Sequence, residues 1–243
     1  MITICMAGAC GRMGRRILEL TSGIENMAAG SALDLPALAG TEIAVTLSNG
    51  KEERLVVGAD SRAEIGKAQV LIDFTAPAAC LEHVAVAEAM KKPAVVGTTG
   101  LSAEQVEALK RFAQNIPVVY APNMSVGVNL LFKLTEEVAR RLGLAYNVEI
   151  VEAHHNLKKD SPSGTAVRLA EQAARGLGLS YPEEAVFGRE GIIGARPERQ
   201  IGVHAIRGGD IVGEHTVSFI GCGERLELTH KAHNRDNFAR GAL

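Results

Sequence analysis

The first fourteen residues constrain the fold of this chain more than any other stretch. A short apolar strand, Ile2–Gly8, runs into a glycine-spaced loop, Gly8–Gly14, and then into an amphipathic helix. The glycines of such a loop let the backbone turn tightly and approach a pyrophosphate closely. Asp34 follows the next strand-like run, twenty residues after Gly14, where an acid can bind ribose hydroxyls. The pattern predicts a dinucleotide site; its alternative is a tight turn beside a surface aspartate.

From Leu35 to Gly66 the pattern fades to short strands joined by turn residues, and strands and helices then alternate again from Ala68 to Tyr120. The expected strands are Ile43–Leu47, Arg54–Val57, Ala68–Thr75, Pro93–Val96 and Pro117–Tyr120, with helices that start at Pro77 and Ser102. This alternation predicts a Rossmann-like, doubly wound parallel sheet, in which ligands bind beyond the carboxyl ends of the strands. The ends of the last three strands carry turn-forming or polar residues, at Phe74–Thr75, Gly97–Gly100 and Ala121–Asn123. Each is ordinary turn chemistry by itself, but together on one edge they can line a nicotinamide pocket.

The stretch Glu152–Thr165 is the densest in reactive side chains. It contains the adjacent His154 and His155, two lysines, and Ser163 as the N-cap of a helix that extends to about Leu177. The backbone N–H groups at the start of this helix, those of Gly164 and Thr165, lie at the positive end of its dipole and favour an anion. We call this helix start the anion site. The stretch predicts a site that holds an anionic substrate and delivers a proton to it.

The second half of the chain is rich in strands. A helix after Asn129 carries one apolar stripe, interpreted as core, made of Leu131, Leu134, Val138 and Leu142. The later strands Gln200–Arg207, Asp210–Ile220 and Glu224–His233 are joined by glycine-rich turns, which favours a mixed or antiparallel sheet in a second, α+β domain. We therefore predict a dinucleotide-binding domain over residues 1–123 and 235–243 and a substrate-binding and oligomerisation domain over 124–234. The open side of that sheet predicts self-association.

Composition excludes several classes of function. The formal net charge is −2 with 47% hydrophobic residues, which gives no electrostatic footprint for nucleic acid or for an anionic membrane. No apolar run is long enough to span a bilayer and the first strand starts at Ile2, so a cytoplasmic protein is expected. The four cysteines lack zinc-ligand spacing, and no metal site is predicted.

Several motifs together resemble one family over nearly the whole chain. They are Gly8–Gly14, Asp73–Thr75, Gly97–Gly100, Ala121–Asn129, Glu152–Thr165 and Arg207–His215. The family is 4-hydroxy-tetrahydrodipicolinate reductase, long called dihydrodipicolinate reductase. The resemblance implies a tetrameric enzyme of diaminopimelate and lysine biosynthesis that reduces a cyclic unsaturated imine dicarboxylate with NADH or NADPH.

The resemblance also implies roles for individual residues. His154 is the expected general acid, His155 a substrate contact, Lys158 an ammonium donor, and Gly164 and Thr165 the carboxylate site. The implied cofactor contacts are Gly8, Ala9, Cys10, Gly11, Arg12, Met13, Gly14, Asp34, Phe74, Thr75, Gly97, Thr98, Thr99, Ala121, Pro122, Asn123, Met124 and Arg235. The chain departs from the family at Leu35, where many members carry arginine after the ribose-binding acid. That departure removes an expected contact to the 2′-phosphate of NADPH.

Two other classes of function remain as alternatives. A dehydrogenase with a different substrate would share the first half of the chain but would leave the anion site and Lys158 unexplained. A non-catalytic dinucleotide sensor would have no need of paired histidines beside an anion site. Oxidation of NADH in a single turnover with the imine would separate the three possibilities.

Overall fold

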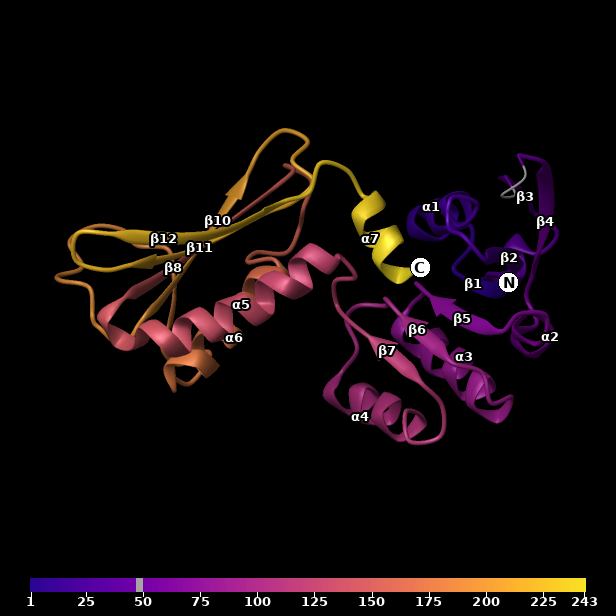
Figure 1. Ribbon diagram of the computed structural model, residues 1–243, viewed down its shortest axis with the longest axis horizontal. Coiled ribbons are helices and arrows are strands. Elements are labelled where there is room, and N and C mark those ends of the chain that lie inside the picture. Colours follow the sequence, from indigo (N-terminus) through magenta and orange to yellow (C-terminus); the bar gives the residue numbers. More distant parts are fainter. Residues whose placement is uncertain (47–49) are drawn as a thin grey trace. The chain divides into compact units, whose positions relative to one another are not determined.

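The computed structural model describes residues 1–46 and 50–243 and divides into two compact units (Figure 1). The first unit comprises Met1–Met124 and Phe238–Leu243, and the second comprises Ser125–Asn237. Among the described residues, no helix combines the length and the apolar character needed to cross a membrane.

The first unit is built on a seven-stranded sheet of order β3-β4-β2-β1-β5-β6-β7. Its strands are β1 (Ile2–Ala7), β2 (Met27–Leu33), β3 (Glu42–Thr46), β4 (Glu52–Gly58), β5 (Val70–Asp73), β6 (Ala94–Val96) and β7 (Val118–Tyr120). All neighbouring pairs are parallel except β3 with β4. The predicted doubly wound parallel sheet is confirmed, and its edge hairpin β3–β4 adds an antiparallel strand. Leu47, the last residue of one predicted strand, lies outside the described residues.

Helices cover both faces of this sheet because β1, β5 and β6 are apolar on both sides. They are α1 (Arg12–Thr21), α2 (Ser61–Gly66), α3 (Pro77–Ala89), α4 (Ala103–Phe112), α7 (Asp236–Ala242) and the 3-10 turn η1 (Pro36–Leu38). One core contains residues of α1 together with Ala239 and Ala242 of α7, and the other contains residues of α2, α3 and α4. Ser102 caps α4 in a reciprocal capping box with Gln105, as the predicted helix start requires.

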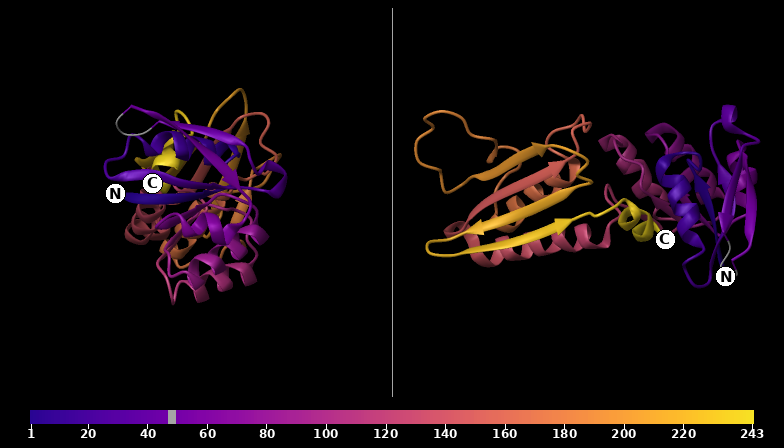
Figure 2. Two further views of the ribbon diagram at one scale, coloured as in Figure 1. Left: turned by 90° about the vertical axis from the view of Figure 1, so that its right-hand side faces the viewer. Right: turned by 90° about the horizontal axis from the view of Figure 1, so that it is seen from above.

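The second unit places two helices on one face of a five-stranded mixed sheet (Figure 2). The helices are α5 (Val126–Leu142) and α6 (Gly164–Leu177), with the 3-10 turn η2 (Gly143–Ala145) after α5. The strands are β8 (Asn147–His154), β9 (Ala185–Phe187), β10 (Ile201–Arg207), β11 (Glu214–Ile220) and β12 (Arg225–Lys231), in the order β12-β11-β8-β10-β9. Strand β8 pairs in parallel with β10 and antiparallel with β11. The sheet is therefore mixed, as predicted.

One detail of the predicted core is wrong. Leu134 of α5 is 41% exposed, although its spacing from Leu131 suggested a shared apolar face. The buried residues of α5 are Val128, Leu131, Phe132, Thr135 and Ala139. Because each residue of an α-helix is rotated by about 100° from the one before, this face is centred near Val128, Thr135 and Ala139, and Leu134 falls outside it.

Candidate active site

The glycine loop between β1 and α1 has the backbone shape of a phosphate-binding turn. Gly8 has φ = +83°, and a Cβ there would lie 2.7 Å from the carbonyl oxygen of Phe74. A Cβ on Gly14 would lie 2.1 Å from the carbonyl oxygen of Gly8. Side chains are thus excluded from both positions, and the bare backbone at the start of α1 forms a cradle that suits a pyrophosphate.

The first turns of α1 carry positive charge. Arg12 and Arg15 lie there, and the first turn has no acidic residue. Cations near a helix N-terminus are unfavourable for the helix itself, because they face the positive end of its dipole. They are favourable once a phosphate binds between them and the helix. The arrangement therefore fits an anionic ligand.

Asp34 follows β2 and joins the glycine loop. Its carboxylate accepts hydrogen bonds from the backbone N–H of Cys10 and of Leu35, each at 2.8 Å. A carboxylate has about four acceptor positions, so it retains capacity for ribose hydroxyls. Leu35 is 64% exposed and offers no hydrogen-bond donor in its side chain.

Asp73, the last residue of β5, organises the neighbouring strand ends. It is fully buried and accepts hydrogen bonds at 2.7 Å from the hydroxyls of Thr75 and Thr98, while His83 of α3 contacts its other oxygen at 2.7 Å. Burial by itself raises the pKa of Asp73, but these hydrogen bonds outweigh burial and hold the pKa below its ordinary value. The ends of β5 and β6 are thus joined through one ionised carboxylate.

The predicted cofactor contacts differ in how they lie. Ala9, Gly14, Gly97, Thr98 and Met124 are buried, so they support the site through packing or backbone groups. Gly8 is buried as well. The half-buried contacts are Cys10, Met13, Asp34, Phe74, Thr75, Ala121 and Asn123, and the exposed ones are Gly11, Arg12, Thr99 and Pro122. Except for Arg235, these residues all belong to the first unit, at β1, β2, β5, β6 and β7. Arg235 is exposed, precedes α7 and belongs to the second unit.

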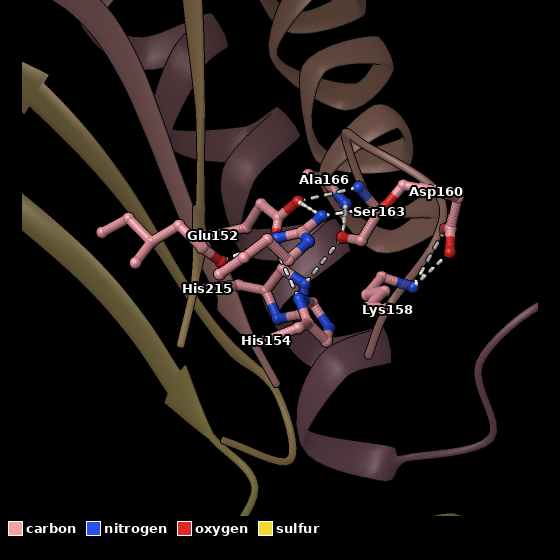
Figure 3. A network of polar contacts seen from close by, with 9 residues as sticks. Glu152, His154, Lys158, Asp160, Ser163, Ala166 and His215 are labelled. Atoms are coloured by element: carbon pink, nitrogen blue, oxygen red, sulfur yellow. Dashed lines mark hydrogen bonds and ion pairs between the residues drawn. The ribbon is translucent and has the colours of Figure 1, made fainter. Parts of the chain in front are cut away.

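The second unit gathers a buried polar network around His154 (Figure 3). His154 ends β8, is 9% exposed, and its Nδ1 lies 2.6 Å from Oε2 of the fully buried Glu152. Arg207, at the end of β10, donates to both Glu152 oxygens at 2.8 Å. The backbone N–H of Ser163 donates to Oε1 of the same carboxylate at 2.9 Å. One carboxylate therefore joins the histidine, the arginine and the start of α6.

His215 of β11 adds a second histidine to this network. Its Nε2 lies 3.1 Å from Oγ of Ser163, and its ring meets the ring of His154 edge-on at 5.2 Å. Burial lowers the pKa of His215 to about 3, so this ring is neutral at physiological pH. Burial also lowers the pKa of His154 below its ordinary value, although the hydrogen bond to Glu152 acts in the opposite direction.

The helix start defined above as the anion site is the N-terminus of α6. The Ser163 hydroxyl caps α6 by accepting the N–H of Ala166 at 3.1 Å. Gly164 is exposed, and apart from its own helix and chain neighbours a Cβ there would meet open space. This leaves open space at the N-terminus of a helix of 14 residues, where the dipole favours an anion.

Lys158 lies beside this network and is paired with a neighbouring acid. Its ammonium donates to both carboxylate oxygens of Asp160, at 3.0 and 2.9 Å. The Lys158 side chain is 20% exposed and that of Asp160 is 63% exposed. His155 is half-buried, and its backbone N–H donates to the carbonyl of Ile211 at 2.8 Å, which fixes the loop. The predicted residues His154, Lys158 and the anion site thus belong to one region of the second unit.

Sequence reasoning gave no role to Glu152, Asp160, Arg207 or His215. A signal for Glu152 was present, because the buried face of β8 continues from Val148 and Ile150 to Glu152 and His154. Two polar residues at the end of an otherwise apolar face indicate a buried polar pair. The sequence around Arg207 and His215 gives no such indication, because these residues reach Glu152 only through the pairing of their strands with β8. Within residues 1–46 and 50–243, no group of three or more potential ligands could hold a metal ion.

Comparisons with known proteins identify the family. The family model described as "Dihydrodipicolinate reductase, N-terminus" matches residues 2–124, and the one described as "Dihydrodipicolinate reductase, C-terminus" matches residues 127–243. The 4-hydroxy-tetrahydrodipicolinate reductase of Syntrophus aciditrophicus is 47% identical over 100% of this chain and 91% of its own length. That of Syntrophobacter fumaroxidans is 48% identical with the same coverage.

Solved structures agree with this assignment. A dipicolinate-bound dihydrodipicolinate reductase from Paenisporosarcina sp. TG-14 has a TM-score of 0.78 and 28% identity, covering 99% of this chain and 91% of that one. A probable dehydrogenase from Thermotoga maritima, at 11% identity and a TM-score of 0.58, covering 99% of this chain and 85% of its own, shares the fold alone. The predicted family is confirmed, and with it the predicted class of activity, a nicotinamide-dependent reductase of diaminopimelate and lysine biosynthesis. The chain belongs to the dihydrodipicolinate reductase family.

Proposed function

We propose that this chain reduces 4-hydroxy-tetrahydrodipicolinate to tetrahydrodipicolinate in the cytoplasm, with the cofactor held by the first unit and the dicarboxylate by the second. The support in the first unit is the glycine cradle beside Asp34. The support in the second unit is a buried histidine beside a lysine and a capped, open helix N-terminus. Both halves of the chain match the same reductase family.

Each residue of the second unit has a separate task in this proposal. The first turn of α6, at Gly164 and Thr165, binds one substrate carboxylate, while Lys158 and His155 contact the same dianion. Loss of the 4-hydroxyl group as water gives the conjugated imine, and a reduced nicotinamide, when bound, would supply a hydride to a ring carbon of that imine. Lys158 stabilises the negative charge that develops on the ring, because a fixed cation acts most strongly where charge appears. His154 then delivers a proton, as an imidazole that titrates near neutral pH can.

One observation carries the assignment of the proton donor. His154 is the histidine that ends β8 next to Lys158, and its Nδ1 is occupied by Glu152. A single-turnover experiment with enzyme in excess over NADH tests the activity: fresh 4-hydroxy-tetrahydrodipicolinate should oxidise the bound NADH. A protein that binds NADH but leaves it reduced would be a sensor. A protein that oxidises NADH with another carbonyl or imine acid, and not with this one, would be a different dehydrogenase.

We predict that NADH serves at least as well as NADPH by kcat/KM. Asp34 can bind both ribose hydroxyls of NADH, whereas its carboxylate repels a 2′-phosphate, and Leu35 gives that phosphate no donor. Within the described glycine loop, residues 8–14, Arg12 is the cation that could compensate. Steady-state assays with both nucleotides decide this. A preference for NADPH of tenfold or more, about 1.4 kcal/mol, contradicts the prediction.

Two variants separate the contributions to this preference. Leu35→Arg should shift the ratio of the two kcat/KM values toward NADPH, because it places a cation beside the ribose site. Arg12→Ala should weaken NADPH more than NADH if Arg12 contacts the 2′-phosphate. Equal losses for the two nucleotides in Arg12→Ala would assign that arginine to the pyrophosphate.

We also predict a homotetramer at micromolar concentration. The face of the second sheet that is turned away from α5 and α6 carries the exposed Val151 and Ile206 among polar residues. An apolar patch on an open sheet face favours association with a symmetry-related copy. Analytical ultracentrifugation should show a tetramer, and Ile206→Glu should shift it to smaller species. Val119→Glu, on the exposed edge strand β7, is the matched control and should leave the tetramer intact; a monomeric wild type rejects the prediction.

A further inference from the structure

The carboxylate of Glu152 is the most heavily bonded group of the second unit. It is fully buried and accepts hydrogen bonds from His154, from the backbone of Ser163 and twice from Arg207, so its partners come from β8, the start of α6 and β10. A surface ion pair would contribute little, but a buried carboxylate with all its acceptor positions filled is held rigidly. Whatever Glu152 fixes is therefore fixed precisely in space.

Glu152 fixes the orientation of the His154 ring. Hydrogen bonds from two Arg207 nitrogens and the Ser163 N–H keep Glu152 ionised, and burial, which alone would raise its pKa, is outweighed so that the pKa is lowered. An ionised carboxylate only accepts, so Nδ1 of His154 must carry a proton and donate it. The Nε2 atom of His154 is thereby left for a ligand. A Cβ on Gly213 would lie 3.1 Å from this Nε2, so the glycine keeps the space beside it open.

We propose that Glu152 and Arg207 act together as positioning residues for the proton donor His154, and that they join it through Ser163 to the anion site. The proposal rests on the proposed function, in which His154 delivers the proton. Neither Glu152 nor Arg207 has to touch the substrate. Glu152 orients the histidine, and Arg207 orients Glu152 while its guanidinium also donates to the carbonyl of Asp160 at 2.9 Å. The His154 ring and the N-terminus of α6 are thereby held in a fixed position relative to each other.

Glu152 and Arg207 change the pKa of His154 in opposite directions, so the effects of replacing each residue can be told apart. Glu152 on its own strand raises the pKa of His154, whereas Lys158 from the following loop and Arg207 from β10 lower it, and the neutral His215 of β11 packs against its ring. Removing Glu152 therefore lowers the pKa of His154 further, and removing Arg207 raises it. Loss of orientation should reduce the rate in both cases.

The test measures kcat against pH for wild type, Glu152→Gln and Arg207→Gln. Because the reaction needs protonated His154, kcat falls as pH rises through the pKa of this histidine in the substrate complex. We call this fall in kcat at high pH the basic limb of the profile. In Glu152→Gln the basic limb should move to lower pH by about one unit, the lower end of the usual effect of a close charge on a pKa. In Arg207→Gln it should move to higher pH. The plateau should fall by at least about tenfold in both, within the range expected for a misplaced acid.

Further measurements guard against loss of fold and against failure of the proposed function. Glu152→Asp keeps the charge but shortens the side chain; its plateau should fall while its limb stays near that of wild type. The dissociation constant of NADH, which concerns the first unit, should be unchanged in every variant that melts cooperatively. Nitrogen-15 NMR of the histidine side chains should show the Nδ1–H tautomer for His154 in wild type and lose that preference in Glu152→Gln, whether or not the enzyme reduces the proposed imine.

Several results would overturn the proposal. If the pH-independent kcat is normal in both Glu152→Gln and Arg207→Gln, the network only stabilises the fold. The same conclusion would follow if the fall in kcat moved in the same pH direction in both variants. An Nε2–H tautomer in the wild-type enzyme would remove the assigned orientation. Failure of the wild type to oxidise NADH with the imine, together with the expected tautomer, would reject the proposed function and leave the positioning of His154 in place.

Discussion

Replacing His154 with glutamine should lower kcat by about 10²-fold or more, the usual scale for the loss of a general acid, with only a modest change in KM. Glutamine retains a donor of similar reach, so the variant can still contact the substrate and Glu152, but it cannot release a proton. Steady-state kinetics with the dicarboxylate substrate measure both parameters. The dissociation constant of NADH should stay at its wild-type value, because the glycine loop and Asp34 belong to the first unit.

The exposed His233 provides the matched control for this variant. His233→Gln makes the same chemical change outside the network and should leave kcat unaltered. Near-normal kcat in His154→Gln would remove His154 from proton transfer and leave it a structural residue.

The pH profile of the wild-type enzyme gives an independent check. The pKa of His154 is lowered in the free protein, chiefly by burial, so kcat/KM should fall as pH rises through a value below the ordinary histidine pKa. Two carboxylates of a bound substrate raise that pKa, so the corresponding limb of kcat should lie at higher pH. If kcat/KM and kcat fall at the same pH, the substrate does not approach His154.

Replacing Lys158 with alanine should damage both KM and kcat. In the ground state the ammonium gives a bound carboxylate its countercharge, and in the transition state it faces the charge that develops on the ring. Hydrogen bonds to charged groups contribute about 1.5 to 3 kcal/mol each, so kcat/KM should fall by roughly 10² or more once both contributions are lost. Steady-state kinetics measure the two parameters separately. The variant differs in kind from His154→Gln, in which KM changes little.

Lys159 is the natural comparison for Lys158, since it is the next residue, has the same side chain and is exposed. Lys159→Ala should leave both parameters within about twofold, in line with the small effect of an exposed charge.

The Lys158–Asp160 pair adds a second check on the role of Lys158. A substrate carboxylate has to share or displace the Asp160 carboxylate at the Lys158 ammonium. If Lys158→Ala alters kcat alone, Lys158 does not bind the substrate in its ground state.

The sequence determined the local elements and the part of the site that lies within one stretch. The strand, glycine loop and helix of residues 2–21 follow from spacing, because glycine tolerates φ values and close contacts that other residues do not. The helix after Ser163 was predictable in both limits, since a serine N-cap and the left-handed Gly178 mark its ends. His154, Lys158 and Gly164 lie within eleven residues of one another, so their proximity needed no knowledge of the fold.

Only the tertiary structure decided which distant residues complete the site. Parallel pairing of β8 with β10 places Arg207 opposite His154, and antiparallel pairing of β8 with β11 places His215 opposite Glu152. Strand order and register depend on packing across the whole sheet, and a shift by one residue would turn each of these side chains to the other face. The face of α5 that is buried was decided in the same way, by what packs against it. Local spacing thus specified the proposed proton donor and the proposed anion site, while sheet register specified the carboxylate and the arginine that contact them.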